Sequence, residues 1–342
     1  MTNLFPAIRG GFAGVSAVVL LSLAVLPGTS SAYVVDGSLS VTGYAEDGTR
    51  GSVVAREAHA LTTVGVDGVT LNRDGASITR VDGGVRDLEA AAHHHGLRAE
   101  LLVSNYDDAI GDFSPQIGSR LLRDPAHRRA VAAELVALVD RQGWDGVTVD
   151  LESLRAEDGP GLTAFVGLLA RSLPAGGSVS VDVMASTTTA GYRATGYQLA
   201  DLATRADVLA LMAYDRHGPT WSQPGPIGPL GWQRATLAAL LDQVPADQVD
   251  LGVAGYGYTW PAAPHRHEGR QVTVAGARRI VAEDGAQARW VPRAGEWTAT
   301  LHDGTVIWWS DARSWSRRVT MAEEARLHGL ALWRIGSADP LP

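Results

Sequence analysis

Short apolar runs alternate with longer amphipathic stretches from Ser38 onward, and this alternation is the feature that most constrains how the chain can fold. The amphipathic stretches have helical periodicity, as in Arg128–Arg141, Gly161–Leu173 and Gln233–Gln243. The apolar runs have the length and composition of strands. They are Leu39–Tyr44, Thr63–Val69, Arg98–Ser104, Gly146–Leu151, Val179–Met184, Val208–Tyr214, Val249–Tyr256 and Gly329–Trp333.

A strand followed by a helix, repeated, predicts parallel strands joined by crossovers. Eight such strands in a chain of 342 residues favour an α/β fold of the (β/α)8 TIM-barrel type. A doubly wound open sheet is the alternative. Against it, no Gly-rich phosphate-binding turn follows the first predicted strand.

The spacing between the seventh and eighth predicted strands is too long for a single helix. Residues 259–315 contain a helical segment, Val274–Asp284, and short strands around 288–290, 297–301 and 306–309. We predict a small α+β insertion within one catalytic barrel that spans residues 33–342. Residues 288–315 of the insertion carry five of the ten tryptophans, of which we expect most to form a small core and one or two to be exposed for binding.

The first 32 residues have the pattern of a secretory signal peptide. Arg9 precedes an apolar stretch, Gly11–Leu26, which is followed by Pro27 and a run of small residues that ends at Ala32. A retained membrane anchor is the alternative, but the apolar stretch is short for a membrane span. We therefore expect cleavage after Ala32, no stable membrane span afterwards, and a secreted or cell-wall-associated protein.

The composition excludes several kinds of chemistry. The chain has no cysteine, and all 29 of its basic residues are arginines. Thiol nucleophiles, cysteine metal sites, Schiff-base lysines and P-loop lysines are therefore excluded. A formal net charge of −8 argues against nucleic acid as a partner. We expect no cofactor and a monomer.

The strongest catalytic candidates lie on the fourth predicted strand. Because side chains alternate along a strand, Val147 and Val149 face the helices while Asp150 and Glu152 face the barrel interior. Glu152 then lies at the carboxyl end of its strand, where barrel active sites open. Two neighbouring carboxylates raise each other's proton affinity. This suits Glu152 as a general acid that stays protonated near neutral pH; an acidic strand end paired with arginine is the alternative.

The segment Asp145–Glu152 resembles the D-G-x-D-x-D-x-E signature of glycoside hydrolase family 18, the chitinase-like enzymes, with Thr148 in place of the second acid. Other resemblances to this family follow in barrel order: Met212–Asp215 to its M-x-Y-D motif, Leu251–Gly257 to its G-x-P-x-Y-G motif, and Leu332–Arg334 to its final tryptophan region. Trp308–Ser314 resembles the branch that contains bacterial spore-cortex peptidoglycan hydrolases.

The resemblance implies substrate-assisted hydrolysis, in which the acetamido group of the sugar is the nucleophile. By the same resemblance, Glu152 is the general acid and base, Asp150 orients the acetamido N–H, and Tyr214 donates to the acetamido oxygen. Asp215 and Trp333 are expected to bind the sugar.

Further residues are assigned from their positions. Tyr44, Asn105 and Tyr256 end predicted strands, and we expect them to contact substrate; packing is the alternative for Tyr44 and Asn105. Asp145 and Gly146 are expected to be structural parts of the motif, together with Thr148. The Thr148 hydroxyl can hydrogen-bond to Asp150, so we expect activity to survive this departure from the family pattern.

The histidines do not form a convincing metal site. The run His93–His95 points in different directions from a helix end, His265 and His267 lie in the insertion, and His217 follows the sixth strand. No G-x-S-x-G segment supports a serine triad. We expect no metal.

These observations predict a secreted glycosidase that hydrolyses β-1,4-linked N-acetylglucosamine polymers, either chitin or the glycan of peptidoglycan. The alternative is a chitinase-like lectin that binds such a polysaccharide with weak or no turnover. A purely structural exported domain is the remaining reading.

Overall fold

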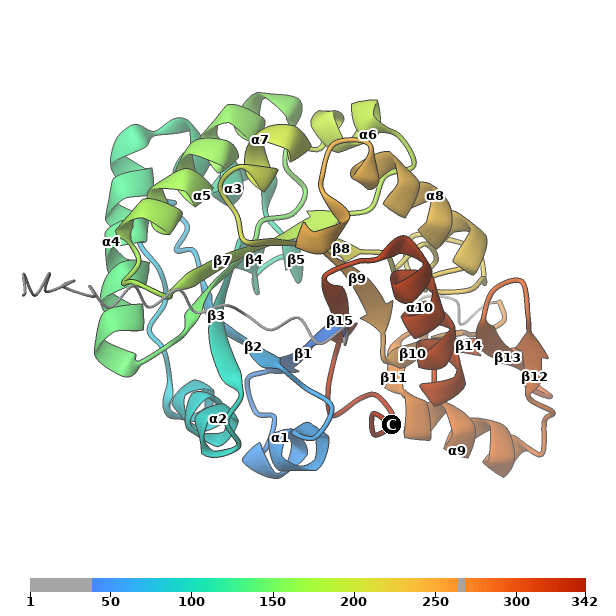
Figure 1. The fold of residues 1–342 in the computed structure, drawn as a ribbon. Coiled ribbons are helices and arrows are strands. Elements are labelled where there is room, and N and C mark those ends of the chain that lie inside the picture. Colours follow the sequence, from blue (N-terminus) through green and yellow to red (C-terminus); the bar gives the residue numbers. More distant parts are fainter. Residues whose placement is uncertain (1–38, 264–267) are drawn as a thin grey trace, which may run out of the picture. The chain divides into compact units, whose positions relative to one another are not determined.

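The computed structural model describes residues 39–263 and 268–342, in which eight parallel strands form a closed barrel (Figure 1). The order around the barrel is β1-β15-β9-β8-β7-β6-β3-β2, so the first and last strands of the chain are hydrogen-bonded neighbours. The strands are β1 (Ser40–Glu46), β2 (Thr63–Thr70), β3 (Arg98–Ser104), β6 (Gly146–Asp150), β7 (Ser178–Met184), β8 (Val208–Met212), β9 (Val249–Ala254) and β15 (Gly329–Trp333).

Helices surround the barrel, and apolar side chains fill the layer between helices and strands. They are α1 (Gly51–Glu57), α2 (Gly83–His94), α3 (Pro115–Arg123), α4 (Pro125–Gln142), α5 (Gly159–Ser172), α6 (Thr189–Ala194), α7 (Leu199–Ala203), α8 (Leu230–Leu241) and α10 (Ala312–Ala325), with 3-10 turns η1 (Ala156–Asp158) and η2 (Ala246–Gln248). A two-stranded ribbon, β4 (Tyr106–Asp107) and β5 (Asp112–Phe113), follows β3. The predicted (β/α)8 barrel is confirmed.

The seventh barrel strand is shorter than predicted. The apolar run Val249–Tyr256 breaks at Gly255: β9 ends at Ala254, and Tyr256 begins β10 (Tyr256–Trp260), which belongs to a different sheet. The Gly255 amide donates to the Trp333 carbonyl at 2.7 Å, and a Cβ at this position would lie 2.6 Å from the Ala338 Cβ. The close approach of the chain to Trp333 and Ala338 at Gly255 thus ends the barrel strand, although the apolar run in the sequence continues past this point.

The region between β9 and β15 forms the predicted small α+β subdomain. Its sheet has the order β11-β10-β14-β13-β12. The remaining elements are β11 (Gln271–Thr273), α9 (Val274–Asp284), β12 (Arg289–Val291), β13 (Glu296–Thr300) and β14 (Val306–Trp309). Figure 1 shows this sheet beside α10 at the edge of the barrel. Residues of α9 pack on it through Val274, Ala277 and Val281.

The five tryptophans expected in the insertion pack in different places, and the expectation that one or two are exposed is wrong. Trp297 and Trp309 belong to the subdomain core, Trp308 packs against a second apolar cluster, and Trp315 of α10 lies in the layer between barrel and helices. Trp309 and Trp315 are buried, and Trp290, Trp297 and Trp308 are half-buried. The rings of Trp297 and Trp309 are stacked with centroids 6.1 Å apart. The guanidinium of Arg313 covers the Trp290 ring at 4.2 Å. Packing against the neighbouring strands and α10 leaves these rings unavailable as exposed platforms.

A buried ion pair connects the subdomain to the barrel. Arg318 of α10 and Glu296 of β13 are both almost fully buried, with nitrogen and oxygen 3.2 Å apart. Glu296 also accepts hydrogen bonds from the backbone amides of Ile227 and Gly228, both at 2.7 Å. Arg318 donates to Gln233, which in turn donates to the Ala213 carbonyl at 2.7 Å. This network therefore reaches from the subdomain to the end of β8.

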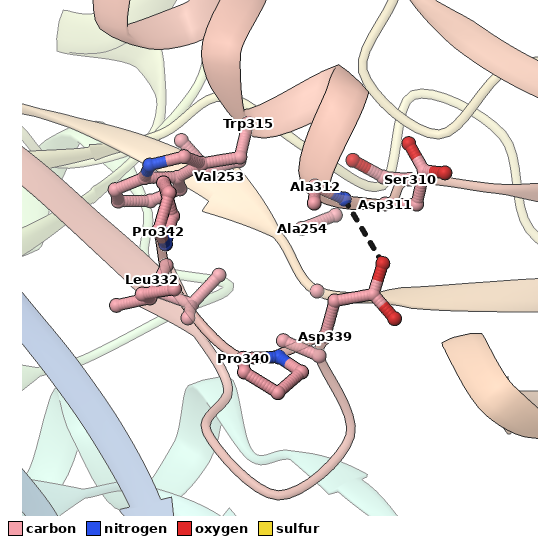
Figure 2. A pocket seen from close by; sticks show the side chains of 13 residues that line it. Val253, Ala254, Ser310, Asp311, Ala312, Trp315, Leu332, Asp339, Pro340 and Pro342 are labelled. Carbon is pink, nitrogen blue, oxygen red and sulfur yellow. Dashed lines mark hydrogen bonds between the residues drawn. The ribbon is translucent and has the colours of Figure 1, made fainter. Parts of the chain in front are cut away.

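The C-terminal segment packs against β9, β15 and α10 around a small pocket (Figure 2). Asp339 accepts a hydrogen bond from the Ala312 amide at the start of α10 and pairs with Arg278 at 2.6 Å. The Leu341 amide donates to buried Glu57. The lining includes none of the carboxylates of β6, so this pocket is separate from the proposed catalytic residues.

The predicted signal peptide, residues 1–32, lies outside the described residues. Over the part of the chain that is described, no helix combines the length and apolar composition needed to cross a bilayer.

Candidate active site

Strand β6 presents its two carboxylates as the alternation rule predicts. Val147 and Val149 are fully buried in the layer between barrel and helices. Asp150, the last residue of β6, is 6% exposed and faces the interior, and Glu152 follows just beyond the strand's carboxyl end. Ser153 then takes a positive φ of 56°, which turns the chain sharply away.

A single buried amide holds the backbone of Glu152. The Asn105 Oδ1 accepts from the Glu152 amide, and the Asn105 Nδ2 donates to the Glu152 carbonyl, both at 2.9 Å. The same Nδ2 also donates to the Ser114 carbonyl. The preceding carbonyl, that of Leu151, accepts from the buried Tyr197 hydroxyl at 3.0 Å.

The expectation that Asn105 contacts substrate is therefore corrected. Its side chain is fully buried, and both donors and its oxygen are already engaged. Asn105 positions the candidate acid instead. Tyr197, which sequence reasoning missed, has the same kind of role, and no pattern along the chain marks it because it lies in a loop between two short helices.

Burial raises the pKa of Glu152 from its ordinary value of 4.5 to about 8. Like charges add to this effect, with Asp215 first and Asp182 next. The protonated state predicted for Glu152 is thus supported, and the predicted repulsion between the two carboxylates acts on Asp150, whose pKa the charge of Glu152 raises. A carboxyl that keeps its proton at neutral pH at the end of a barrel can act as a general acid.

Asp150 has a carboxylate oxygen without a partner. Its Oδ1 is buried and makes no hydrogen bond. Burial raises the pKa of Asp150 well above its ordinary value, and the charges of Glu152 and Asp182 raise it further. An unsatisfied buried acceptor is costly, so this oxygen is suited to receive a donor from a ligand.

Thr148 does not make the hydrogen bond to Asp150 that was expected. Its hydroxyl donates to Glu100 Oε2 on β3, at 2.9 Å, rather than to Asp150. Thr148 is fully buried one inward position below Asp150. The reason is geometric, because Leu102 of β3 is the register partner of Thr148 and the longer Glu100 side chain reaches up from the position below.

Strand β8 leads to Tyr214 and Asp215. The Asp215 Oδ1 accepts from the hydroxyls of Tyr256 and Tyr258, at 2.5 and 3.0 Å. Asp215 itself is exposed and has a positive φ of 56°. Tyr256, expected to bind substrate, has no exposed surface, so it orients Asp215 instead. Tyr258 shares this task and sequence reasoning missed it, although it follows Tyr256 at the strand period of two.

Trp333 and Tyr44 come together from β15 and β1. Their ring centroids are 5.6 Å apart, and Trp333 is half-buried. Tyr44 is 3% exposed and donates its hydroxyl to Asp182 Oδ1 at 2.7 Å. The expectation that Tyr44 contacts substrate is therefore corrected: it packs against Trp333 and binds an interior carboxylate.

An exposed tryptophan, Trp221, lies beside Asp215 and Tyr258. It is 55% exposed, its indole N–H donates to the Asp215 carbonyl at 3.3 Å, and its ring meets Tyr258 edge-on. Sequence reasoning missed it because it lies in a loop without periodicity. Such an exposed ring can stack on a pyranose.

Asp145 and Gly146 lie at the opposite, amino end of β6. Asp145 Oδ2 accepts from the Ala99 amide and contacts His93 Nε2, both at 2.8 Å. A Cβ on Gly146 would lie 2.3 Å from Ser178 Oγ, so a side chain does not fit. The contacts of Asp145 and the close packing at Gly146 agree with the structural roles expected for both residues.

His93 and His217, two of the histidines considered as ligands, bind protein groups. His93 contacts Glu89 and Asp145, and His217 Nδ1 lies 2.8 Å from the Pro226 carbonyl. His265 and His267 lie outside the described residues. Within residues 39–263 and 268–342, no cluster of three potential ligand side chains is arranged to hold a metal ion.

Comparison with known proteins agrees with this geometry. The family described as glycosyl hydrolases family 18 matches residues 83–338. The putative sporulation-specific glycosylase YdhD of Bacillus subtilis is 30% identical over 234 residues, which is 66% of this chain and 55% of that protein. The cortical fragment-lytic enzyme of the same organism is 24% identical, covering 84% of this chain and 67% of that one.

Solved structures show the same fold. The spore cortex-lytic enzyme SleL of Bacillus cereus has a TM-score of 0.78 at 19% identity, covering 87% of this chain and 71% of that one. A chitinase from Chromobacterium violaceum has a TM-score of 0.78 at 26% identity, covering 88% and 96%.

The fold and the carboxylate-bearing strand define a barrel of the glycosidase class. The chain belongs to glycosyl hydrolase family 18, as its sequence resemblance predicted. It spans little more than half the length of YdhD.

Proposed function

We propose that this protein hydrolyses β-1,4-linked N-acetylglucosamine polymers with retention of configuration, using the acetamido group of the substrate as nucleophile. The observation that carries the proposal is the pairing of a protonated Glu152 with a buried, unpartnered Asp150 oxygen two residues away. The first supplies a proton, and the second supplies an acceptor that an acetamido N–H can satisfy.

In the first step Glu152 gives its proton to the glycosidic oxygen as the bond from C1 to that oxygen breaks. The acetamido carbonyl oxygen forms a bond to C1, and the resulting positive ring is balanced by the Asp150 carboxylate, which accepts the N–H. In the second step the Glu152 carboxylate removes a proton from water, whose oxygen attacks C1 and reopens the ring. Glu152 thereby regains its proton.

Aromatic groups and Asp215 supply the sugar contacts. Tyr214 donates its hydroxyl to the acetamido oxygen, and burial raises the pKa of Tyr214 well above its ordinary value, so it remains a donor. Trp333 packs under the reacting sugar, and the exposed Trp221 stacks on a neighbouring one. Asp215, held by two tyrosine hydroxyls, binds sugar hydroxyls.

Purified protein incubated with chitin oligomers and with peptidoglycan tests the proposal. The expected result is release of new reducing ends from at least one of the two, with products that carry N-acetylglucosamine at that end and are first formed as the β-anomer. Glu152→Gln is expected to lower kcat about 100-fold or more. Glu283→Gln, the same change at an exposed site on α9, is the matched control and retains activity.

Two outcomes contradict the proposal. Activity that survives Glu152→Gln refutes the mechanism. Binding of both glycans without turnover by the unaltered protein identifies it as a lectin. The identity of the hydrolysed glycan decides between chitin and peptidoglycan, and the cortex-lytic names of several relatives support testing peptidoglycan first.

We also propose that the protein acts outside the cell. The support is the charged, apolar and small-residue order of residues 1–32. Protein recovered from the culture medium is expected to begin at Tyr33, as measured by sequencing its amino terminus. Full-length protein retained in the membrane fraction would contradict this.

A further inference from the structure

Asp182 of β7 occupies the interior position next to Asp150. Val149 of β6 pairs with Val181 of β7, so the residues that follow them are adjacent inward positions on two hydrogen-bonded strands. Register partners in a sheet point to the same face with their Cβ atoms about 5 Å apart. Asp182 is 4% exposed. Two carboxyls are therefore buried side by side.

The two carboxyls have unequal surroundings. Asp182 Oδ1 accepts the Tyr44 hydroxyl at 2.7 Å, whereas Asp150 Oδ1 has no donor. A hydrogen bond to the ionised form favours that form. The negative charge is thus better accommodated on Asp182, and the proton is better accommodated on Asp150.

The inward position below Asp150 on its own strand is held by Thr148. A threonine hydroxyl neither gains nor loses a proton near neutral pH, and this hydroxyl donates its hydrogen bond to Glu100. This inward position is therefore neutral. On β7 the register neighbour of Thr148 is Ser180, and the acid Asp182 lies one inward position higher, beside Asp150.

We propose that Asp182 shares one proton and one negative charge with Asp150, and thereby sets the protonation state in which Asp150 receives the substrate. This inference rests on the proposed function. Asp182 is a positioning residue, because it acts through Asp150 and contacts no substrate. Tyr44 takes part by holding the Asp182 oxygen.

The exchange conserves charge and protons. Without substrate the proton resides on Asp150 and the charge on Asp182. When the acetamido N–H donates to Asp150, the ionised form of Asp150 is favoured, so Asp150 loses its proton and Asp182 gains one. The Asp150–Asp182 pair keeps a total charge of −1 throughout, so the barrel interior never holds two adjacent negative charges at this place.

Other ionisable groups also act on Asp182 from the surrounding strands. Burial raises the pKa of Asp182 to about 7, the Tyr44 hydroxyl opposes this rise, and the charges of Glu100, Asp250 and Asp67 add to it. The groups that face the pair are Tyr44 on β1, Asp67 on β2, Glu100 on β3, Glu152 after β6, Tyr197 after α6, Tyr214 after β8 and Asp250 on β9.

Asp182→Asn tests the inference, because it keeps the oxygen that accepts from Tyr44 and removes only the charge. In the free enzyme Asp182 carries the charge, and its removal lowers the proton affinity of Asp150 and of Glu152, so both limbs of the pH profile of kcat/KM are expected to move down by about half a unit or more. KM is expected to change less than about twofold. Asp182→Glu restores the acid and returns the profile toward that of the unaltered protein.

Asp250→Asn is the matched control. It removes a buried interior carboxylate from β9, where Asp250 is bound to His328. The charge of Asp250 acts on Asp182 but is not among the charges that raise the pKa of Asp150 or Glu152, so only a smaller shift of the profile is expected. A profile that Asp182→Asn leaves unmoved, or that Asp250→Asn moves equally, overturns the inference.

A proton titration without substrate separates this inference from the proposed function. Without substrate, Asp182→Asn is expected to move proton release by the neighbouring carboxyls to lower pH by about half a unit or more, because the charge beside Asp150 is gone. A titration curve that keeps its position refutes the shared proton even when the enzyme is active. Absence of hydrolysis together with the expected shift refutes the proposed function and leaves the coupling of the two carboxyls intact.

Discussion

Replacing Glu152 with glutamine is expected to change how stability depends on pH, independently of any effect on catalysis. The pKa of Glu152 is about 8 in the folded protein and 4.5 as its ordinary value. A carboxyl with a raised folded pKa contributes its stability fully below the ordinary pKa, and this stability is lost as the pH rises through the folded pKa. The unaltered protein is thus weakened at alkaline pH by ionising this buried group.

The magnitude follows from the size of the shift. Each pKa unit corresponds to about 1.4 kcal/mol, so a rise from 4.5 to about 8 amounts to at most about 5 kcal/mol once the group is fully ionised. Glu152 is partly exposed and coupled to neighbouring acids, which reduces the net effect to about 2–3 kcal/mol. Glutamine does not titrate and avoids this loss.

Urea unfolding followed by tryptophan fluorescence measures the effect. The difference in free energy of unfolding between Glu152→Gln and the unaltered protein is expected to be near zero at about pH 4 and to favour the variant by about 2–3 kcal/mol at about pH 9. Glu283→Gln, an exposed control, is expected to show no such trend. A difference that stays constant with pH, or that favours the unaltered protein at alkaline pH, refutes the electrostatic reasoning.

Three further substitutions test the supports of the site. Asn105→Ala removes the amide that holds the acid's backbone, and we expect a loss of about 2–4 kcal/mol of stability and a lower kcat with little change in KM, measured by urea unfolding and steady-state kinetics. Tyr256→Phe removes one of the two donors to Asp215, and an increase in KM of about threefold to tenfold is expected; an unchanged KM counts against Asp215 as a sugar ligand. Arg318→Met leaves Glu296 buried without its cation, so we expect about 3–5 kcal/mol of destabilisation, and a variant as stable as the parent in thermal unfolding contradicts this.

The barrel and the strand that carries the candidate acid were predictable because both follow from periodicity. Strand alternation alone placed Val147 and Val149 outward and Asp150 inward, and the structure agrees. The same rule, applied to the run Val179–Met184, marks Asp182 as an inward acid between two outward valines. It was missed because no motif drew attention to that strand.

Contacts across the barrel were less predictable. Whether Tyr44 and Asn105 meet substrate or protein depends on strand tilt and shear, which local sequence does not encode. Asn105 follows the end of β3, as predicted, whereas β1 continues two residues beyond Tyr44. Both side chains are buried against partners from elsewhere in the chain. The tryptophans of the insertion were misjudged for a related reason, since α10 and the hairpin strands cover rings that the sequence alone leaves without neighbours.

The Arg318–Glu296 pair has a consequence for exchanging parts between related barrels. The cation comes from the helix that returns to the barrel, and its anion comes from the subdomain. A chimera that swaps the subdomain for one without a carboxylate at this position inherits an uncompensated buried charge. Helix α10 and the subdomain therefore need to be exchanged together in a chimera. The boundaries of the exchanged segment belong outside both, in β9 and β15.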